Sequence, residues 1–169
     1  MVTKKIAFLL LMATALFANA QESEKESLLS LINKNKGDTE EVNALTYLAN
    51  QESEADLRAK YVNQALAIAE RIDFQKGIAD CNLVFAKINS NSNFSLSIQY
   101  SLDALAIFKN IKDYPGIATA CLSLQGGYRD GIADYRSSLE YAFAGKQIAE
   151  KHNPRMYLCI PPGKHIKKQ

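Results

Sequence analysis

Histidine is the residue type that most often supplies acid–base catalysis or a metal ligand near neutral pH. This chain has two histidines, His152 and His165, and they lie beside Pro154 and Pro161-Pro162 close to its C-terminal end. Neither the histidines nor the cysteines have the spacing of a metal or redox motif. We therefore expect no catalytic residue, no metal, no cofactor and no enzymatic activity.

The three cysteines are Cys81, Cys121 and Cys159. Cys81 and Cys121 are separated by 40 positions, so they could lie near each other on neighbouring helices. Free cysteine is among the most buried residue types, which favours two unpaired core thiols over a disulfide between them. The sequence assigns no role to Cys159 and determines the redox state of none of the three.

Two further patterns suggest chemistry at first sight. Gly126-Gly127 precedes Tyr128 without a strand or the spacing of a phosphate-binding loop, so it predicts a helix end. The alternating acids Glu22, Glu24 and Glu26 predict a solvated segment in preference to a metal site.

The elements that must position any functional residue nearly repeat along the chain. The segment 64–68 recurs 39 positions later as 103–107, and Gly77-Ile78-Ala79 recurs at the same spacing as Gly116-Ile117-Ala118. A repeat of roughly 20–50 residues is typical of architectures in which each unit is a supersecondary element stacked on the next. The period therefore predicts a binding scaffold.

The apolar spacing within the repeat is helical, at i, i+4, i+7 and i+11. The second position is always small, which permits close approach of another helix, and the recurring tyrosine favours core packing over an aromatic binding ladder. A third copy follows the second at the slightly longer spacing of 41 positions; the three sets are Tyr61, Ala65, Ile68, Ile72; Tyr100, Ala104, Ile107, Ile111; and Tyr141, Gly145, Ile148, His152.

A second set of helices is predicted over residues 39–50, 75–89 and 116–128, each followed by a polar break. Asp38 with Glu41 three positions later predicts a capping box at the first of them. The chain is thus expected to be all-α, an α-solenoid-like array of about three helical hairpins over residues 38–152. Residues 21–37 are expected to form an N-terminal capping helix and linker, because Leu28, Leu29, Leu31 and Ile32 fit a short amphipathic helix.

Residues 1–20 predict a secretory signal, with Lys4-Lys5, a short apolar region and Ala18-Asn19-Ala20 at the cleavage site. The apolar region is shorter than the roughly 20 residues of a membrane span, so we expect cleavage after Ala20, export to the periplasm or medium, and no integral span thereafter.

Cleavage would remove two of the 20 basic residues and leave 18 basic against 18 acidic residues. Residues 153–169 are expected to form a loose basic tail. Residues 21–150 hold 13 basic and 18 acidic residues. This balance offers no electrostatic footprint for nucleic acid.

The alternating helix pairs resemble tetratricopeptide repeats, with Ala-Leu-x-Ile late in one helix, an aromatic before it (Phe94, Tyr135) and Gly-Ile-Ala opening the next. Leu28-Leu29-Ser30-Leu31-Ile32 and the segment 38–45 are also similar to the extracytoplasmic sensor region of bacterial tetratricopeptide-containing histidine kinases. Val84 or Phe85 departs from the pattern, which has a small residue there.

The resemblance implies that the first helix of each pair lines a concave groove for a peptide or protein partner. Polar residues off the core stripe of those helices are then the candidate binding residues: Asn43, Thr46, Asn82, Lys87, Thr119 and Ser123.

A fourth repeat should begin near Tyr157-Leu158, but Pro161-Pro162-Gly163 stops it after about one turn. Two functions are therefore open: an exported interaction scaffold, or the truncated sensory region of a signal-transduction protein, which a reading frame continuing downstream would reveal. Either way the last helix, 137–151, is expected to leave an apolar face uncovered, and this face is expected to promote self-association or instability.

Overall fold

The computed structural model describes residues 25–34 and 36–152, and their regular structure is helical throughout. The chain divides into two compact units, Met1–Ile72 and Asp73–Gln169. The predicted all-α array of helical hairpins is confirmed. The expected signal segment, the basic tail, Cys159, His165 and the interrupted fourth repeat lie outside the described residues.

The first unit contains one hairpin and the helix that precedes it. Residues 25–33 are helical, as the leucine pattern predicts. The hairpin consists of α2, Thr39–Gln51, and α3, Ala55–Arg71. Val42, Leu45, Val62 and Ala65 are completely buried and form its core.

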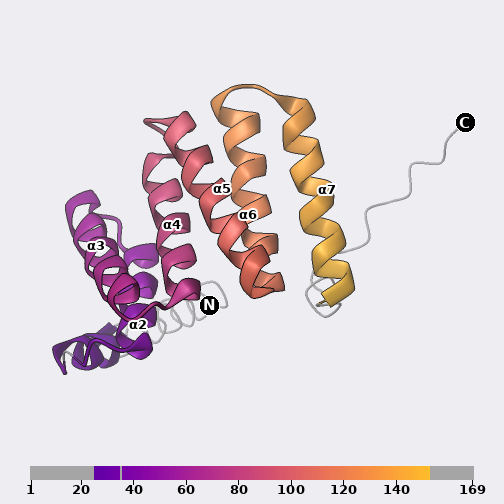
Figure 1. Cartoon of the computed structure of the whole chain (residues 1–169). Coiled ribbons are helices and arrows are strands. Elements are labelled where there is room, and N and C mark those ends of the chain that lie inside the picture. The colour runs from indigo at the N-terminus through magenta and orange to yellow at the C-terminus, as the bar shows by residue number, and fades with distance from the viewer. Residues whose placement is uncertain (1–24, 35, 153–169) are drawn as a thin grey trace, which may run out of the picture. The chain divides into compact units, whose positions relative to one another are not determined.

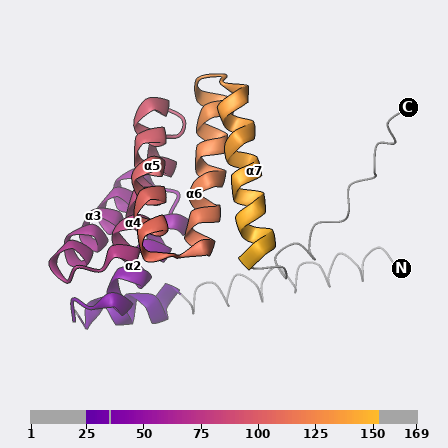
Figure 2. The same cartoon turned by 45° about the vertical axis from the view of Figure 1, so that its right-hand side comes forward.

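The second unit contains two hairpins, and in each the two helices pack side by side (Figure 1). The first pairs α4, Gln75–Asn89, with α5, Phe94–Ile111. The second pairs α6, Tyr114–Gly126, with α7, Tyr135–His152. A short π-helix, η1, Gly127–Gly131, leads from α6 toward α7. Both views show α5, α6 and α7 in chain order, and α5 also packs on α6 (Figure 2).

The longer spacing of the last repeat copy arises at η1. The helix α5 starts 39 positions after α3, whereas α7 starts 41 positions after α5. A π-helix accommodates inserted residues within a helix. It also lies close to α5, because a Cβ added to Gly127 would be 2.8 Å from Ile98 and one added to Gly131 would be 2.6 Å from Phe94. These glycines therefore let the longer connection pack against α5.

Small residues allow close helix contacts where the repeat predicts them. Ala65 and Ala104 are completely buried, and Gly145 is buried against α6, where an added Cβ would be 3.0 Å from the Cβ of Cys121. The closest approach is at Gly116 of α6, where an added Cβ would be 2.3 Å from the ring of Phe108. Phe108 is completely buried at the centre of the second unit's core.

Aromatic pairs join the two halves of each hairpin in the second unit. Phe85 of α4 stacks on Tyr100 of α5 with ring centroids 5.2 Å apart. Tyr128 of η1 stacks on Tyr141 of α7 at 5.5 Å. Tyr100 and Tyr141 therefore pack within the structure, as their core spacing predicts.

Cys81 of α4 and Cys121 of α6 are both buried, and neither is part of a disulfide. This confirms the preference for core thiols over a disulfide. Burial raises the pKa of the Cys121 thiol, and the positive charge of Lys109 opposes this only in part. A raised pKa keeps the thiol protonated and unreactive at neutral pH.

A charged link joins the starts of α4 and α6. Lys76 Nζ donates to Asp113 Oδ2 at 2.6 Å, and Asp113 Oδ1 accepts from the Gly116 N–H at 3.2 Å as the N-cap of α6. Partial burial alone would raise the pKa of the Asp113 carboxyl, but these two hydrogen bonds outweigh it and lower the pKa below its ordinary value.

Within the described part of the chain, no helix combines the length and the apolarity that a bilayer crossing requires.

Candidate peptide-binding groove

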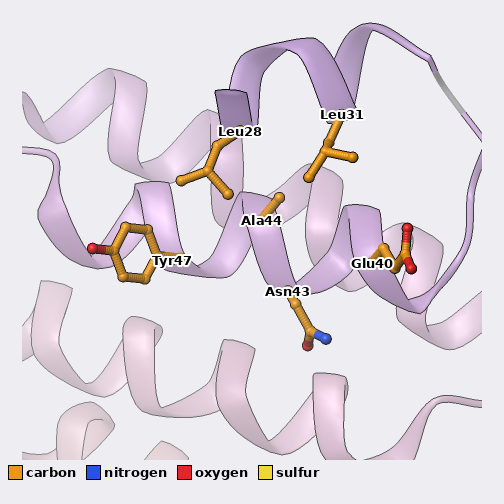
Figure 3. A pocket seen from close by; sticks show the side chains of 6 residues that line it. All are labelled: Leu28, Leu31, Glu40, Asn43, Ala44 and Tyr47. Atoms are coloured by element: carbon orange, nitrogen blue, oxygen red, sulfur yellow. The ribbon is translucent and has the colours of Figure 1, made fainter. Parts of the chain in front are cut away.

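An open groove of about 470 Å³ lies in the first unit, between the helix of residues 25–33 and α2. Two leucines of the first helix, Leu28 and Leu31, face Ala44 and Tyr47 of α2 across it (Figure 3). Glu40 and Asn43 supply the polar part of the lining. Pockets for small ligands and short peptide segments commonly have about 300–1,000 Å³, an apolar lining and a few polar groups.

The polar and apolar groups of this groove are separated along α2. Figure 3 shows Tyr47 beside Leu28 at one end and the Glu40 carboxylate at the other, with Asn43 between them along the helix. Tyr47 is 41% exposed, so its ring is available for contact. The groove can therefore take an apolar side chain at one end and a hydrogen-bond donor or cation at the other.

The position of Glu40 and Asn43 depends on how α2 begins. Asp38 Oδ1 accepts from the Glu41 N–H at 3.0 Å, which is one half of the predicted capping box. The other half differs: the Glu41 carboxylate accepts from the Gly37 N–H at 2.7 Å, one residue before the N-cap. The cause is the backbone of Gly37, whose φ of +64° turns its N–H toward α2.

The same start is held by a residue distant in sequence. Arg71, at the end of α3, donates to the Gly37 carbonyl oxygen at 3.3 Å. Glu41 is 1% exposed and its second carboxylate oxygen, Oε1, has no hydrogen-bond partner among the described residues. The turn before α2 is therefore a packed structural feature that determines which α2 side chains face the groove.

An ion pair joins the helix of residues 25–33 to the far end of α2. Lys25 Nζ is 3.6 Å from Glu52 Oε2, and Glu52 is the C-cap of α2. The N–H groups of Glu54 and Ser53 donate to Glu52 Oε1 at 3.2 and 2.9 Å and lower the pKa of its carboxyl. Glu52 is therefore charged at neutral pH, and its pair with Lys25 links the two walls of the groove.

Of the six binding residues suggested by the sequence, Asn43 lines this groove. Thr46 is 7% exposed and its hydroxyl donates to the Val42 carbonyl oxygen at 2.7 Å, within its own helix. The other four belong to the second unit. Lys87 and Thr119 are exposed, and Asn82 and Ser123 are half-buried.

Two of these residues have bonds that already engage their hydroxyl groups. Thr119 donates to the Pro115 carbonyl oxygen at 3.0 Å, and the Ser123 hydroxyl is 2.7 Å from that of Ser101. Asn82 and Lys87 belong to α4, and Thr119 and Ser123 belong to α6.

Sequence reasoning misses most of the groove's lining. The leucine pattern predicts only a cover for the end of the hairpin, and Tyr47 belongs to the apolar residues of its predicted helix. A usable signal is present: Tyr47 lies off the buried face that Val42, Leu45 and Ala49 form, so its ring must point elsewhere.

Other functional residue types are dispersed. His152 stacks on Tyr114 with ring centroids 3.5 Å apart, which joins the end of α7 to the start of α6. Over residues 25–34 and 36–152, no group of three or more His, Cys, Asp or Glu side chains could hold a metal ion.

In comparisons with protein-family models, curated proteins and solved structures, none matches this chain.

Proposed function

We propose that this protein is a non-enzymatic interaction scaffold of the tetratricopeptide type, which is exported and binds a peptide segment of a partner protein. The observation that carries the proposal is the open groove beside α2, in which an apolar surface meets one exposed acid and one exposed amide. The hairpin of α2 and α3 supplies a packed framework for it.

The lining indicates what kind of peptide would bind. Leu28, Leu31 and Tyr47 provide apolar contact area for one or two side chains of leucine size. The Glu40 carboxylate would attract a lysine or arginine next to them, and the Asn43 amide can both donate to and accept from a peptide backbone. We expect a short segment in which a basic residue is close to bulky apolar residues.

The experiment is a selection of random displayed peptides on the chain from Gln21 onward, the form expected after signal cleavage. Selected peptides should be rich in this basic-plus-apolar pattern. Tyr47→Ser should weaken their binding about tenfold or more, because aromatic anchors dominate such interfaces. Glu40→Lys should weaken the basic peptides selectively.

Leu122→Ser is the matched control, because Leu122 is also an exposed apolar residue, 58% accessible, but belongs to α6 in the second unit. It should leave peptide affinity unchanged. The proposal is wrong if no peptide is enriched, or if the enriched peptides bind Tyr47→Ser as tightly as the unaltered protein.

A further inference from the structure

The α2 wall of the groove in the first unit presents one exposed acid, Glu40. The other acids at α2 have structural roles. Asp38 caps the helix and Glu41 is buried. Glu52 is the C-cap and pairs with Lys25. A basic residue of the occupant is therefore favoured at the Glu40 end of the groove.

The distance between this acid and the aromatic ring limits the spacing of an occupant. Glu40 and Tyr47 are seven positions apart on α2 with Asn43 between them (Figure 3), which at about 1.5 Å per residue is about 10 Å along the helix. A polyproline-type peptide rises about 3.1 Å per residue and has about three residues per turn, so its residues i and i+3 share a face about 9 Å apart. The groove therefore fits a basic residue followed three positions later by an apolar one.

A segment of this chain that lies outside the described residues contains that pattern. Arg155 is followed by five apolar residues, 156–160, and Leu158 is three positions after it. Pro154 precedes this segment and Pro161-Pro162 follow it. Proline disfavours a helix and biases the residue before it toward an extended or polyproline conformation. The sequence of the segment thus favours the conformation that the spacing requires.

The charges of the segment and the groove are also complementary. Residues 153–169 contain four basic residues and no acid, whereas α2 with its two caps, residues 38–52, contains four acids and no basic residue. Complementary charges guide association and disfavour wrong pairings. The expected signal, residues 1–20, also joins Lys5 to apolar residues, but its removal is expected. The segment after α7 is therefore the better match within this chain.

We propose that residues 155–160 of this chain occupy the groove of the first unit. Arg155 pairs with Glu40 at one end, and Leu158 packs beside Tyr47 at the other. This inference rests on the proposed function and adds a form of regulation to it, because a peptide of a partner protein must displace the chain's own segment before it can bind.

The first test places the photoreactive amino acid p-benzoylphenylalanine at position 47, in place of Tyr47, in the chain from Gln21 onward. After irradiation, peptide mapping should find an adduct that joins position 47 to residues 155–160, within one copy or between two. Leu158→Ser should lower the adduct yield at least about tenfold, because it removes the apolar anchor. Ile166→Ser is the matched control, since it removes an apolar residue of the same size outside residues 155–160, and it should leave the yield unchanged.

The second test examines the ion pair. A synthetic peptide of residues 153–169 is titrated into the chain with Leu158→Ser, whose own segment no longer fills the groove. Glu40→Lys in the protein and Arg155→Glu in the peptide should each weaken binding at least about fivefold, since each brings like charges together. The two changes combined should restore binding. Glu40→Lys combined with Lys168→Glu in the peptide is the control and should not restore it.

The absence of an adduct between position 47 and residues 155–160 would overturn the inference, as would a double charge reversal that binds no better than either single change. The same holds if a photoreactive residue in place of Leu139 captures residues 155–160 while one at position 47 does not, since the segment would then pack on α7. If displayed peptides still require Tyr47 although residues 155–160 form no adduct, the proposed function stands and this inference alone is wrong. If displayed peptides also fail to bind, both are wrong.

Discussion

Replacing Gly116 by alanine should destabilise the second unit, although the same change normally stabilises a helix. Glycine within a helix is about 0.5–1 kcal/mol less favourable than alanine. At Gly116, however, the added Cβ would lie 2.3–2.6 Å from three ring atoms of Phe108. Real Cβ contacts are not this short, so either the ring or α6 must move.

The ring cannot move without cost, because Phe108 is completely buried in the core. Overpacking a well-packed core typically costs about 1–3 kcal/mol. Subtracting the gain in helix propensity leaves a range of about 0–2.5 kcal/mol, so we expect Gly116→Ala to lower the free energy of unfolding by roughly 1 kcal/mol. Gly126→Ala in the same helix is the control, since nothing lies within 4 Å of its added Cβ, and it should be neutral or slightly stabilising.

The assay is urea unfolding followed by far-ultraviolet circular dichroism, with hydrogen exchange over α5 and α6 to assign the loss to the second unit. A double-mutant cycle with Phe108→Leu then tests the cause. Leucine lacks the ring atoms that overlap the new Cβ, so Gly116→Ala should cost much less in that background. The reasoning fails if Gly116→Ala is as stable as the Gly126→Ala control, or if its cost is unchanged by Phe108→Leu.

The remaining predictions concern the charged link and the buried thiols. Removing the Lys76–Asp113 pair with Lys76→Met and Asp113→Asn should reveal a coupling of only about 0.5–1 kcal/mol, because the Lys76 side chain is 47% exposed. Folding lowers the pKa of Asp113, so the stabilisation from this pair is present above the ordinary Asp pKa of 3.8 and should disappear as the pH falls below 3.8. The difference in urea midpoint between the unaltered protein and Asp113→Asn should therefore shrink at low pH. If that difference is constant between pH 7 and pH 3, the carboxyl is not charged in the pair as described. In a Cys159→Ser background, a thiol reagent should modify neither Cys81 nor Cys121 in the native protein and both after denaturation. Rapid modification of the native protein, or reaction of neither thiol in denaturant, would contradict two buried thiols that form no disulfide.

Sequence reasoning locates the helices because their signals are local. The boundaries of α4 follow from its apolar spacing and the polar break after Asn89, and Asp38 is the N-cap of α2 as its spacing from Glu41 indicates. The small residue at Gly145 correctly marks a close helix contact. The longer spacing of the last copy is also visible in the sequence, although the π-helix that accommodates it is not.

Tertiary structure decided which faces meet and which remain open. The sequence makes Asn43 and Thr46 equivalent candidates, yet Asn43 lines the groove while Thr46 is buried with its hydroxyl bonded within α2. The sequence also could not show that Gly116 lies against Phe108, or that Leu139 is exposed whereas Ile98 is buried. Helical periodicity is a property of neighbouring residues, whereas contact and exposure depend on which distant helix lies opposite, and that is determined only when the hairpins pack.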